Sequence, residues 1–300
     1  MKVVLYIISI YGWLMGNYKY FISVKKSAVK NNLVDFFGYS HKRADIDTLK
    51  HFVTFSRGQL LQWWYGNLSA RSRSKFIAEF VDYKIHPKAL ALARSSEGAI
   101  IITPHQSIQS IAAIGLSKFL SENESKLGTF FDSTDVNSGN AKHLEVIDSD
   151  KEDIMIFHNS TRDLVKSIRS LRGGMWLSMY PDIFQYSSAF IAVPMFNRVM
   201  AGMSGIEYMA SKTGSAVISG VAEFKNGRLE IKIHEPIRTE LLKSGAISSL
   251  VYTRLEKCIR EQPYNWQYLS QMKQYVIVDQ PIDRIATIKT EKMNSPITTV

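Results

Sequence analysis

The sequence predicts an α/β protein, a single domain built on a mixed β-sheet with a helical, membrane-facing extension at its N-terminus. Short β-branched runs alternate with helical stretches from residue 97 onward, as in an α/β sheet. The 300 residues are 45% hydrophobic and 21% charged, which suits a chain that buries a core. Residues 1–94 contain 15 Lys and Arg against 5 Asp and Glu, whereas the remainder contains 22 against 22. The excess positive charge therefore lies in the first third.

The chain opens on an almost wholly apolar run over residues 3–15. A spanning helix needs about 20 apolar residues, and no small-residue cleavage site follows, as a signal peptide would require. Trp13, Tyr18 and Tyr20 stand beside lysines, a pattern typical of interfacial anchors. We expect residues 1–26 to be a membrane-associating segment, peripheral or anchored, that places the protein on the cytoplasmic face of the inner membrane. The alternative is the buried first helix of a soluble domain.

The basic region that follows, residues 44–94, is predicted to form two or three amphipathic helices, one of them capped by Asp47 and running to Arg57. Aromatic residues beside basic ones can also mark a nucleic-acid surface. No helix-turn-helix, zinc-finger or RNA-binding signature accompanies them, so no nucleic acid is expected. An anionic membrane surface or an acidic partner protein attracts the same charge.

Residues 27–280, including these N-terminal helices, are expected to form the α/β domain, and residues 281–300 a loosely attached polar tail. Short β-branched runs predict strands over 99–103, 128–131, 154–157, 175–179 and 216–221. Apolar stretches that end at Gly173-Gly174, at Gly214 or before Pro263 predict helices over 108–121, 160–171, 201–212 and 247–261. Asn226-Gly227 predicts a hairpin that joins residues 220–224 to 229–234. The single cysteine, Cys258, excludes an internal disulfide, and no Cys/His group has zinc spacing, so no metal is expected.

The most suggestive local feature is a buried strand that delivers His105 to the start of a helix. Reactive groups collect at such strand ends in open α/β sheets. A histidine there is, taken alone, more often a helix-start hydrogen bonder than a catalyst. Further blocks follow in a fixed order, namely Leu171-Arg172-Gly173, Pro181-Asp182, Met209 to Ala216, and finally Pro263, Trp266, Tyr268 and Lys273.

In this order the blocks resemble the late acyltransferases of lipid A biosynthesis, members of the lysophospholipid acyltransferase superfamily, over residues 97–273. The resemblance implies an acyltransferase-like fold and an acyl chain moving to a hydroxyl of a lipid acceptor. The donor would be the thioester of an acyl carrier protein or of CoA, a co-substrate that leaves no cofactor to be bound. The resemblance implies that His105 is the general base. The family's motif acid falls on Ser110, so the chain is a divergent member lacking that carboxylate.

Two hypotheses follow from the missing acid. An amine attacks a thioester without first losing its proton, so an amine acceptor would need less from His105, with Ser110 orienting the ring. The second hypothesis is a catalytically inactive pseudoenzyme that binds lipid or a partner. We favour retained acyl transfer, because a neutral scaffold would not require His105. A serine hydrolase is disfavoured, since residues 202–206 fail the Gly-X-Ser-X-Gly motif at the last position.

Four further residues are candidates for substrate binding. Arg162, Lys166 and Arg169 stand at i, i+4 and i+7 on one helix face, which suits a phosphate or phosphopantetheine group. A solvated basic face balanced by Asp163 is the alternative. Asp182 follows a proline at a strand end, where it could orient substrate or cap a turn, and the family resemblance favours the site.

Overall fold

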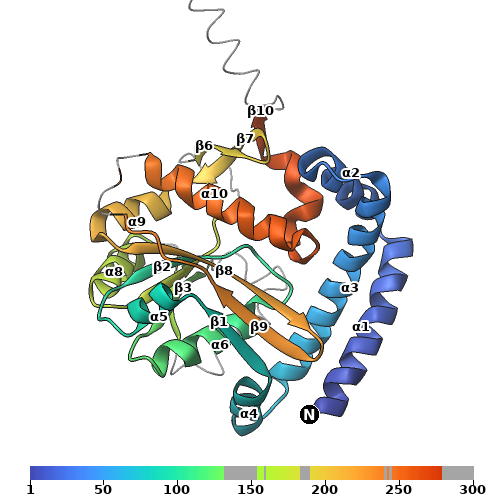
Figure 1. Cartoon of the computed structure of the whole chain (residues 1–300), viewed down its shortest axis with the longest axis horizontal. Coiled ribbons are helices and arrows are strands. Elements are labelled where there is room, and N and C mark those ends of the chain that lie inside the picture. The colour runs from blue at the N-terminus through green and yellow to red at the C-terminus, as the bar shows by residue number, and fades with distance from the viewer. Residues whose placement is uncertain (132–153, 159, 183–189, 240–241, 243–244, 279–300) are drawn as a thin grey trace, which may run out of the picture.

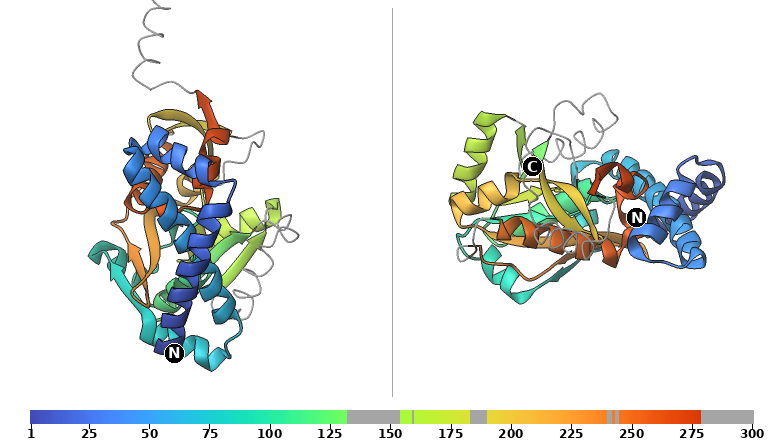
Figure 2. Two further views of the ribbon diagram at one scale, coloured as in Figure 1. Left: turned by 90° about the vertical axis from the view of Figure 1, so that its right-hand side faces the viewer. Right: turned by 90° about the horizontal axis from the view of Figure 1, so that it is seen from above.

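The computed structural model describes residues 1–131, 154–158, 160–182, 190–239, 242 and 245–278 (Figure 1). Helices cover both faces of a mixed β-sheet, so the predicted mixed-sheet α/β class is confirmed. The predicted tail, residues 281–300, lies outside the described residues. The N-terminal helices gather at one end of the molecule, beside the sheet (Figures 1 and 2).

The main sheet has seven strands in the order β1-β9-β8-β2-β5-β3-β4. Their bounds are β1 Val81–Ile85, β9 Arg228–Ile233, β8 Ala216–Lys225, β2 Ala99–Ile102, β5 Trp176–Met179, β3 Leu127–Phe131 and β4 Ile154–His158. Strands β8, β2, β5, β3 and β4 are parallel, whereas β9 is antiparallel to β8 and parallel to β1. Asn226 and Gly227 turn between β8 and β9 at φ 53° and 74°, which confirms the predicted hairpin.

Two hydrophobic cores lie on the two faces of this sheet. Along β2, Ile101 packs into one core, while Ile100 and Ile102 pack into the other, as the alternation of side chains in a strand requires. The first core is covered by α4 (Ala70–Phe80), α5 (Pro87–Ala93) and α6 (Gln109–Ser121). The second is covered by α8 (Thr161–Arg172), α9 (Gly205–Thr213) and α10 (Ala246–Glu261).

A second, three-stranded sheet corrects one predicted helix. Residues 201–212 were expected to be helical, but Ala201 lies in β7 (Arg198–Met203) and α9 begins only at Gly205. Strand β7 pairs antiparallel with β6 (Phe190–Met195) and with β10 (Val276–Val278). The hairpin with β6, closed by the turn at Phe196-Asn197, and the long-range pairing with β10 override the local helical pattern. Two 3-10 segments, η2 (Pro263–Asn265) and η3 (Gln267–Tyr275), lead from α10 to β10.

The region 44–94 departs from its prediction twice. Asp47 does not cap a helix, because α3 (His41–Gly66) already begins after Ser40, whose hydroxyl accepts the Arg43 N–H at 3.4 Å. Asp47 instead lies within α3 and pairs with Lys50 at 3.2 Å. The all-helical expectation also missed β1, whose alternating sequence becomes a strand by pairing with the distant β9.

The first helix, α1 (Lys2–Ile22), lies lengthwise along α3 (Figures 1 and 2). The helix α2 (Lys26–Phe37) lies between α1 and α3 in the chain. Gly12 and Gly16 form the seam, since a Cβ at either position would lie 2.4 Å from Arg57 Cγ or Val53 Cα respectively. Away from the seam, α1 exposes apolar side chains that are at least 50% accessible, namely Val3, Tyr6, Tyr11, Trp13, Leu14, Tyr18, Phe21 and Ile22. We call these eight residues the outer face of α1. Among the described residues, no helix is both long enough and apolar enough to span a bilayer.

Candidate active site

Two chain segments leave the sheet side by side at the carboxyl ends of β2 and β5. These strands are parallel neighbours that pair Ile102 with Met179, the last residue of each. His105 and Asp182 each stand three positions beyond those residues. The Thr103 N–H also donates to Met179 O at 3.1 Å, so the segments stay paired just past the strands. Equal offsets from a common register bring the imidazole and the carboxylate together.

The Asp182 carboxylate holds His105 through both of its oxygens. Oδ1 lies 2.7 Å from the imidazole Nδ1, and Oδ2 accepts the backbone N–H of His105 at 2.7 Å. An ionised carboxylate can only accept, so Nδ1 carries the proton and Nε2 is the basic ring nitrogen. Asp182 is fully buried and His105 is 8% exposed. The ring is therefore oriented by a charge that solvent screens weakly.

Trp266 supplies a further donor to the same carboxylate. Its indole Nε1–H donates to Asp182 Oδ2 at 2.8 Å, and the side chain is 1% exposed. The next residue binds the histidine loop directly, since the Gln267 N–H donates to His105 O at 2.9 Å. The segment between η2 and η3 thus contacts both members of the pair.

Helix α3 fixes the loop that carries His105. Gln62 Nε2 donates to Ser107 O at 2.7 Å, and the Ser107 hydroxyl donates to Asn265 Oδ1 at 2.9 Å. Gly58 permits this approach, because a Cβ there would lie 2.5 Å from Ser107 O. The N-terminal helices are therefore part of the scaffold of the site and not only an appendage.

Two tyrosine rings flank the imidazole. The Tyr180 ring centroid lies 4.5 Å from that of His105, and the Tyr268 centroid lies 5.2 Å away at 76°. Burial raises the pKa of Tyr180 to about 12, with the charge of Asp182 adding to the rise and a hydrogen bond to Ser178 opposing it. The Tyr180 phenol therefore stays protonated at neutral pH.

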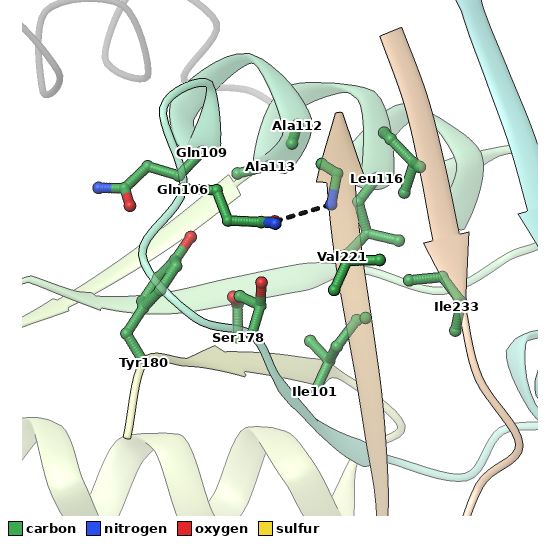
Figure 3. A pocket seen from close by; sticks show the side chains of 14 residues that line it. Ile101, Gln106, Gln109, Ala112, Ala113, Leu116, Ser178, Tyr180, Val221 and Ile233 are labelled. Atoms are coloured by element: carbon green, nitrogen blue, oxygen red, sulfur yellow. Dashed lines mark hydrogen bonds between the residues drawn. The ribbon is translucent and has the colours of Figure 1, made fainter. Parts of the chain in front are cut away.

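A small apolar cavity of about 40 Å³ lies beside His105, between α6 and the sheet (Figure 3). Gln106 and Tyr180 line its polar end. Gln106 extends across the cavity to β8, where its Oε1 accepts the Ala222 N–H at 2.7 Å (Figure 3). The apolar wall is formed by Ile101, Ala112, Ala113, Leu116, Ile231 and Ile233. The lining of the cavity is of the kind found in ligand sites, but its volume is well below the roughly 300 Å³ at which ligand pockets begin.

The structure places the predicted site residues in three locations. His105 and Asp182 are in contact. Ser110 is buried in the first turn of α6 at 2% exposure, while the Nδ1 atom of His105 that it was expected to orient is bonded to Asp182.

The basic residues Arg162, Lys166 and Arg169 do share one exposed face of α8. None of the three lines the cavity beside His105. Lys166 lies 3.5 Å from Asp163, and a hydrogen bond from His158 N lowers the pKa of that carboxyl, with Lys166 contributing. The predicted basic face therefore exists, but it lies on α8, whereas His105 lies in the segment between β2 and α6.

Sequence reasoning did not anticipate two contacts of the site. Asp182 was expected to orient substrate or to cap a turn and was not paired with His105, and Trp266 entered only as part of a family block. The available signal was the equal spacing of Thr103-Pro104-His105 and Tyr180-Pro181-Asp182 after their strands. That signal acquires meaning only once β2 and β5 are known to be neighbours.

This fold and site define an α/β protein with a buried histidine–carboxylate pair at neighbouring strand ends, next to an apolar cavity, an arrangement suited to general-base chemistry on an apolar substrate. The chain belongs to the bacterial lipid A biosynthesis acyltransferase family, whose model matches residues 1–273. This match confirms the family resemblance and supports a transferase of acyl groups. No match to the chain was found among curated proteins.

Proposed function

We propose that the protein transfers an acyl group from a thioester to a hydroxyl of a lipid A-like acceptor, with His105 as the general base and Asp182 as the carboxylate that orients it. The observation that carries this proposal is the 2.7 Å contact between His105 Nδ1 and Asp182 Oδ1, just beyond the carboxyl ends of β2 and β5. Family membership supplies the reaction class.

The proposed reaction proceeds through one tetrahedral intermediate. The acceptor hydroxyl oxygen attacks the thioester carbonyl carbon while its proton moves to His105 Nε2. The intermediate then collapses, the carbon–sulfur bond breaks, and the leaving sulfur takes the proton back from His105 as a thiol. Asp182 keeps the imidazole in the tautomer that can accept this proton and stabilises the imidazolium that forms.

A hydroxyl acceptor fits this site better than an amine does. The amine hypothesis depended on a histidine without a carboxylate, because an amine needs less help from a base. With Asp182 in contact with Nδ1, His105 has the partner that hydroxyl activation demands. The same contact argues against a pseudoenzyme, since a buried ion-pair geometry is expensive to keep in a scaffold without chemistry.

The cavity between α6 and the sheet is proposed to take no more than the first one or two carbons of the acyl chain, because its volume is about 40 Å³. Its apolar wall takes hydrocarbon, and its polar end at Gln106 and Tyr180 adjoins His105. This arrangement would place the thioester carbonyl at the imidazole and the first carbons of the chain beneath α6. The donor is proposed to be an acyl carrier protein or CoA thioester attracted by Arg162, Lys166 and Arg169 on α8, which covers the other face of the sheet from this cavity.

We further propose that α1 binds the cytoplasmic face of the inner membrane as a peripheral anchor. Its outer face presents apolar and aromatic side chains along the whole helix, and Lys25 and Lys26 follow at its end. The Lys26 ammonium lies 3.9 Å from the centre of the Tyr20 ring. Aromatic residues beside lysines match the chemistry of an anionic bilayer interface.

Mass spectrometry of lipids from cells with and without the protein tests the proposed reaction. One lipid A-like species should lack a single ester-linked acyl chain when the protein is removed, and the chain should return with the wild-type protein and not with His105→Ala. An amide-linked product would replace our acceptor with an amine. Unchanged lipids would favour the pseudoenzyme.

A further inference from the structure

We infer that Trp266 is a positioning residue for the His105–Asp182 pair. Its indole N–H binds Oδ2, the carboxylate oxygen that does not contact the imidazole ring, and thereby fixes the orientation of the imidazole. This inference rests on the proposed function for its kinetic consequence, but the hydrogen bond on which it depends can be tested without any activity.

The geometry gives each carboxylate oxygen a separate task. Oδ1 contacts the imidazole Nδ1 at 2.7 Å, while Oδ2 accepts both the His105 N–H at 2.7 Å and the Trp266 Nε1–H at 2.8 Å. Without the indole, the one donor to Oδ2 left among the described residues would be the backbone N–H of His105 itself. Trp266 is therefore the side-chain contact that ties Asp182 to a different part of the fold.

The indole is itself held in place by aromatic packing. The Phe196 ring stacks on Trp266 at 5.9 Å between centroids and 25° between planes. Phe196 is buried at φ 54° in the turn between β6 and β7, a conformation that bulky residues rarely adopt. Its N–H donates to Glu256 Oε2 at 2.9 Å. Phe196 is thus held by Glu256 of α10 in a backbone conformation that is strained for a bulky residue, and its ring stacks on Trp266. This packing indicates that the position of the Trp266 indole is closely determined.

The charge of the carboxylate gives the indole a chemical effect beyond packing. Hydrogen bonds from N–H groups stabilise the ionised carboxylate and reduce the tendency of the pair to take up a proton. Removing the Trp266 N–H should therefore make the pair bind a proton more tightly. The acid limb of the pH profile of kcat/KM should move to higher pH, an effect that a purely structural role of Trp266 would not produce.

Trp176 provides a matched control. It is a second fully buried tryptophan, at the start of β5, and among the described residues its Nε1 has no hydrogen-bond partner. Trp176→Phe and Trp266→Phe thus remove the same ring from comparable environments, but only the second removes a donor to Asp182. Because Trp266→Phe also loses packing against Phe196, a closer isostere is needed as well. Benzothienylalanine at position 266 keeps the bicyclic shape and replaces only the N–H with sulfur.

The experiment measures the full-length protein in two ways. The pH profile of kcat/KM is recorded with an acyl carrier protein thioester, and the solvent exchange of the imidazole Nδ1 proton of His105 is followed by ¹⁵N-resolved NMR. We expect the position-266 variants to shift the acid limb upward by roughly 0.5 to 1 pH unit, the scale of one hydrogen bond. They should also lower kcat/KM by roughly tenfold and speed proton exchange by a similar factor. Trp176→Phe should change neither measurement.

An unchanged acid limb and unchanged proton exchange with benzothienylalanine at position 266 would overturn the inference, even if Trp266→Phe fails to fold. Failure of the proposed function gives a different result. In that case the wild-type protein transfers no acyl group at any pH, while the exchange of the His105 proton still decides whether the indole holds Asp182.

Discussion

Asp182 Oδ1 lies 2.7 Å from His105 Nδ1, although the two residues are 77 positions apart in the chain. They meet because β2 and β5 are parallel neighbours with Ile102 opposite Met179, and each residue stands three positions past its strand. Ser110 stands where the resemblance would place the family's motif acid, whereas the carboxylate in contact with His105 belongs to Asp182, beyond the end of β5.

The basic face of α8 should determine the affinity for a carrier-bound donor and not the chemical step. Reversing Arg162, Lys166 and Arg169 to Glu removes three cations from an exposed face. We expect KM for an acyl carrier protein thioester to rise at least tenfold with kcat little changed, an effect that salt should mimic in the wild type.

The matched control for α8 reverses exposed cations elsewhere, at Lys118, Lys126 and Lys225, outside the basic region 44–94. This triple variant should leave KM within about twofold of wild type, because charges beyond a Debye length, about 10 Å at 0.1 M salt, are largely screened. Equal KM values for the two triple variants would remove α8 as the donor site.

The outer face of α1 should set the affinity for anionic membranes. Replacing Tyr6, Trp13 and Phe21 with Ser removes three large exposed side chains, and we expect partitioning onto vesicles that contain anionic lipid to fall at least tenfold. Sedimentation with vesicles measures this change.

The control for α1 replaces Met155, Val165 and Tyr208 with Ser, since these side chains are exposed to a similar extent on other elements. Its vesicle binding should equal that of the wild type. Steeply salt-dependent binding to duplex DNA by a wild-type protein that ignores vesicles would instead favour the nucleic-acid alternative.

The seam between α1 and α3 should tolerate no side chain at Gly16. A Cβ there would lie 2.4 Å from Val53 Cα, so Gly16→Val must push the helices apart. We expect the free energy of unfolding to fall by about 1 to 3 kcal/mol. Met15→Val changes an adjacent exposed position and should cost about 0.5 kcal/mol or less. Denaturant titration measures both unfolding free energies. Equal stability of Gly16→Val and Met15→Val would contradict the close packing of α1 against α3 at Gly16.

The buried His51 should make the protein sensitive to acid. Burial lowers its pKa to about 4, with the Tyr264 carbonyl partly opposing the shift and Lys25 adding to it. The folded state excludes a proton that the unfolded chain binds below about pH 6.5. Stability is therefore fully present above pH 6.5 and is lost as the pH falls to about 4, by about 3 kcal/mol in total.

His51→Gln removes this titration while keeping a donor for the Tyr264 carbonyl that now accepts from His51 Nδ1 at 3.0 Å. Its free energy of unfolding should fall less steeply between pH 6.5 and 4 than that of the wild type, whereas the exposed His41→Gln should follow the wild type. Identical slopes for His51→Gln and wild type would contradict the assignment.

Local patterns were sufficient to locate most strands of the main sheet. The predicted runs 99–103 and 175–179 differ from β2 and β5 by one residue at an end, because continuous apolar runs mark strands buried on both faces. Strand β1 was missed since its sequence alternates within a basic, helix-rich region, and only pairing with β9 makes it a strand. Strand β7 was missed although β6 precedes it across a two-residue turn; its second partner, β10, is distant in the chain.

The candidate site was predictable only in part. His105 stood out because its strand and following helix are local features. Its partner did not, because two other strands, β3 and β4, lie between β2 and β5 in the chain while hydrogen bonds make β2 and β5 neighbours in the sheet. Sequence spacing led to Ser110, five positions after His105, whereas the tertiary fold delivers Asp182.

The central claim is that Asp182 orients His105 for acyl transfer to a hydroxyl. Asp182→Asn keeps the size of the side chain but removes its charge. The amide then faces His105 Nδ1 either with its NH2 group, which cannot accept a hydrogen bond, or with its neutral oxygen, so in both orientations the imidazole loses its charged partner. In a serine protease the corresponding change costs about 10⁴ in turnover. With purified protein, an acyl carrier protein thioester and a lipid A-like acceptor, we predict a fall in kcat of roughly 10³ to 10⁴ for Asp182→Asn, while Ser110→Ala stays within about tenfold of wild type. Full activity of Asp182→Asn, or a loss confined to Ser110→Ala, would contradict the account.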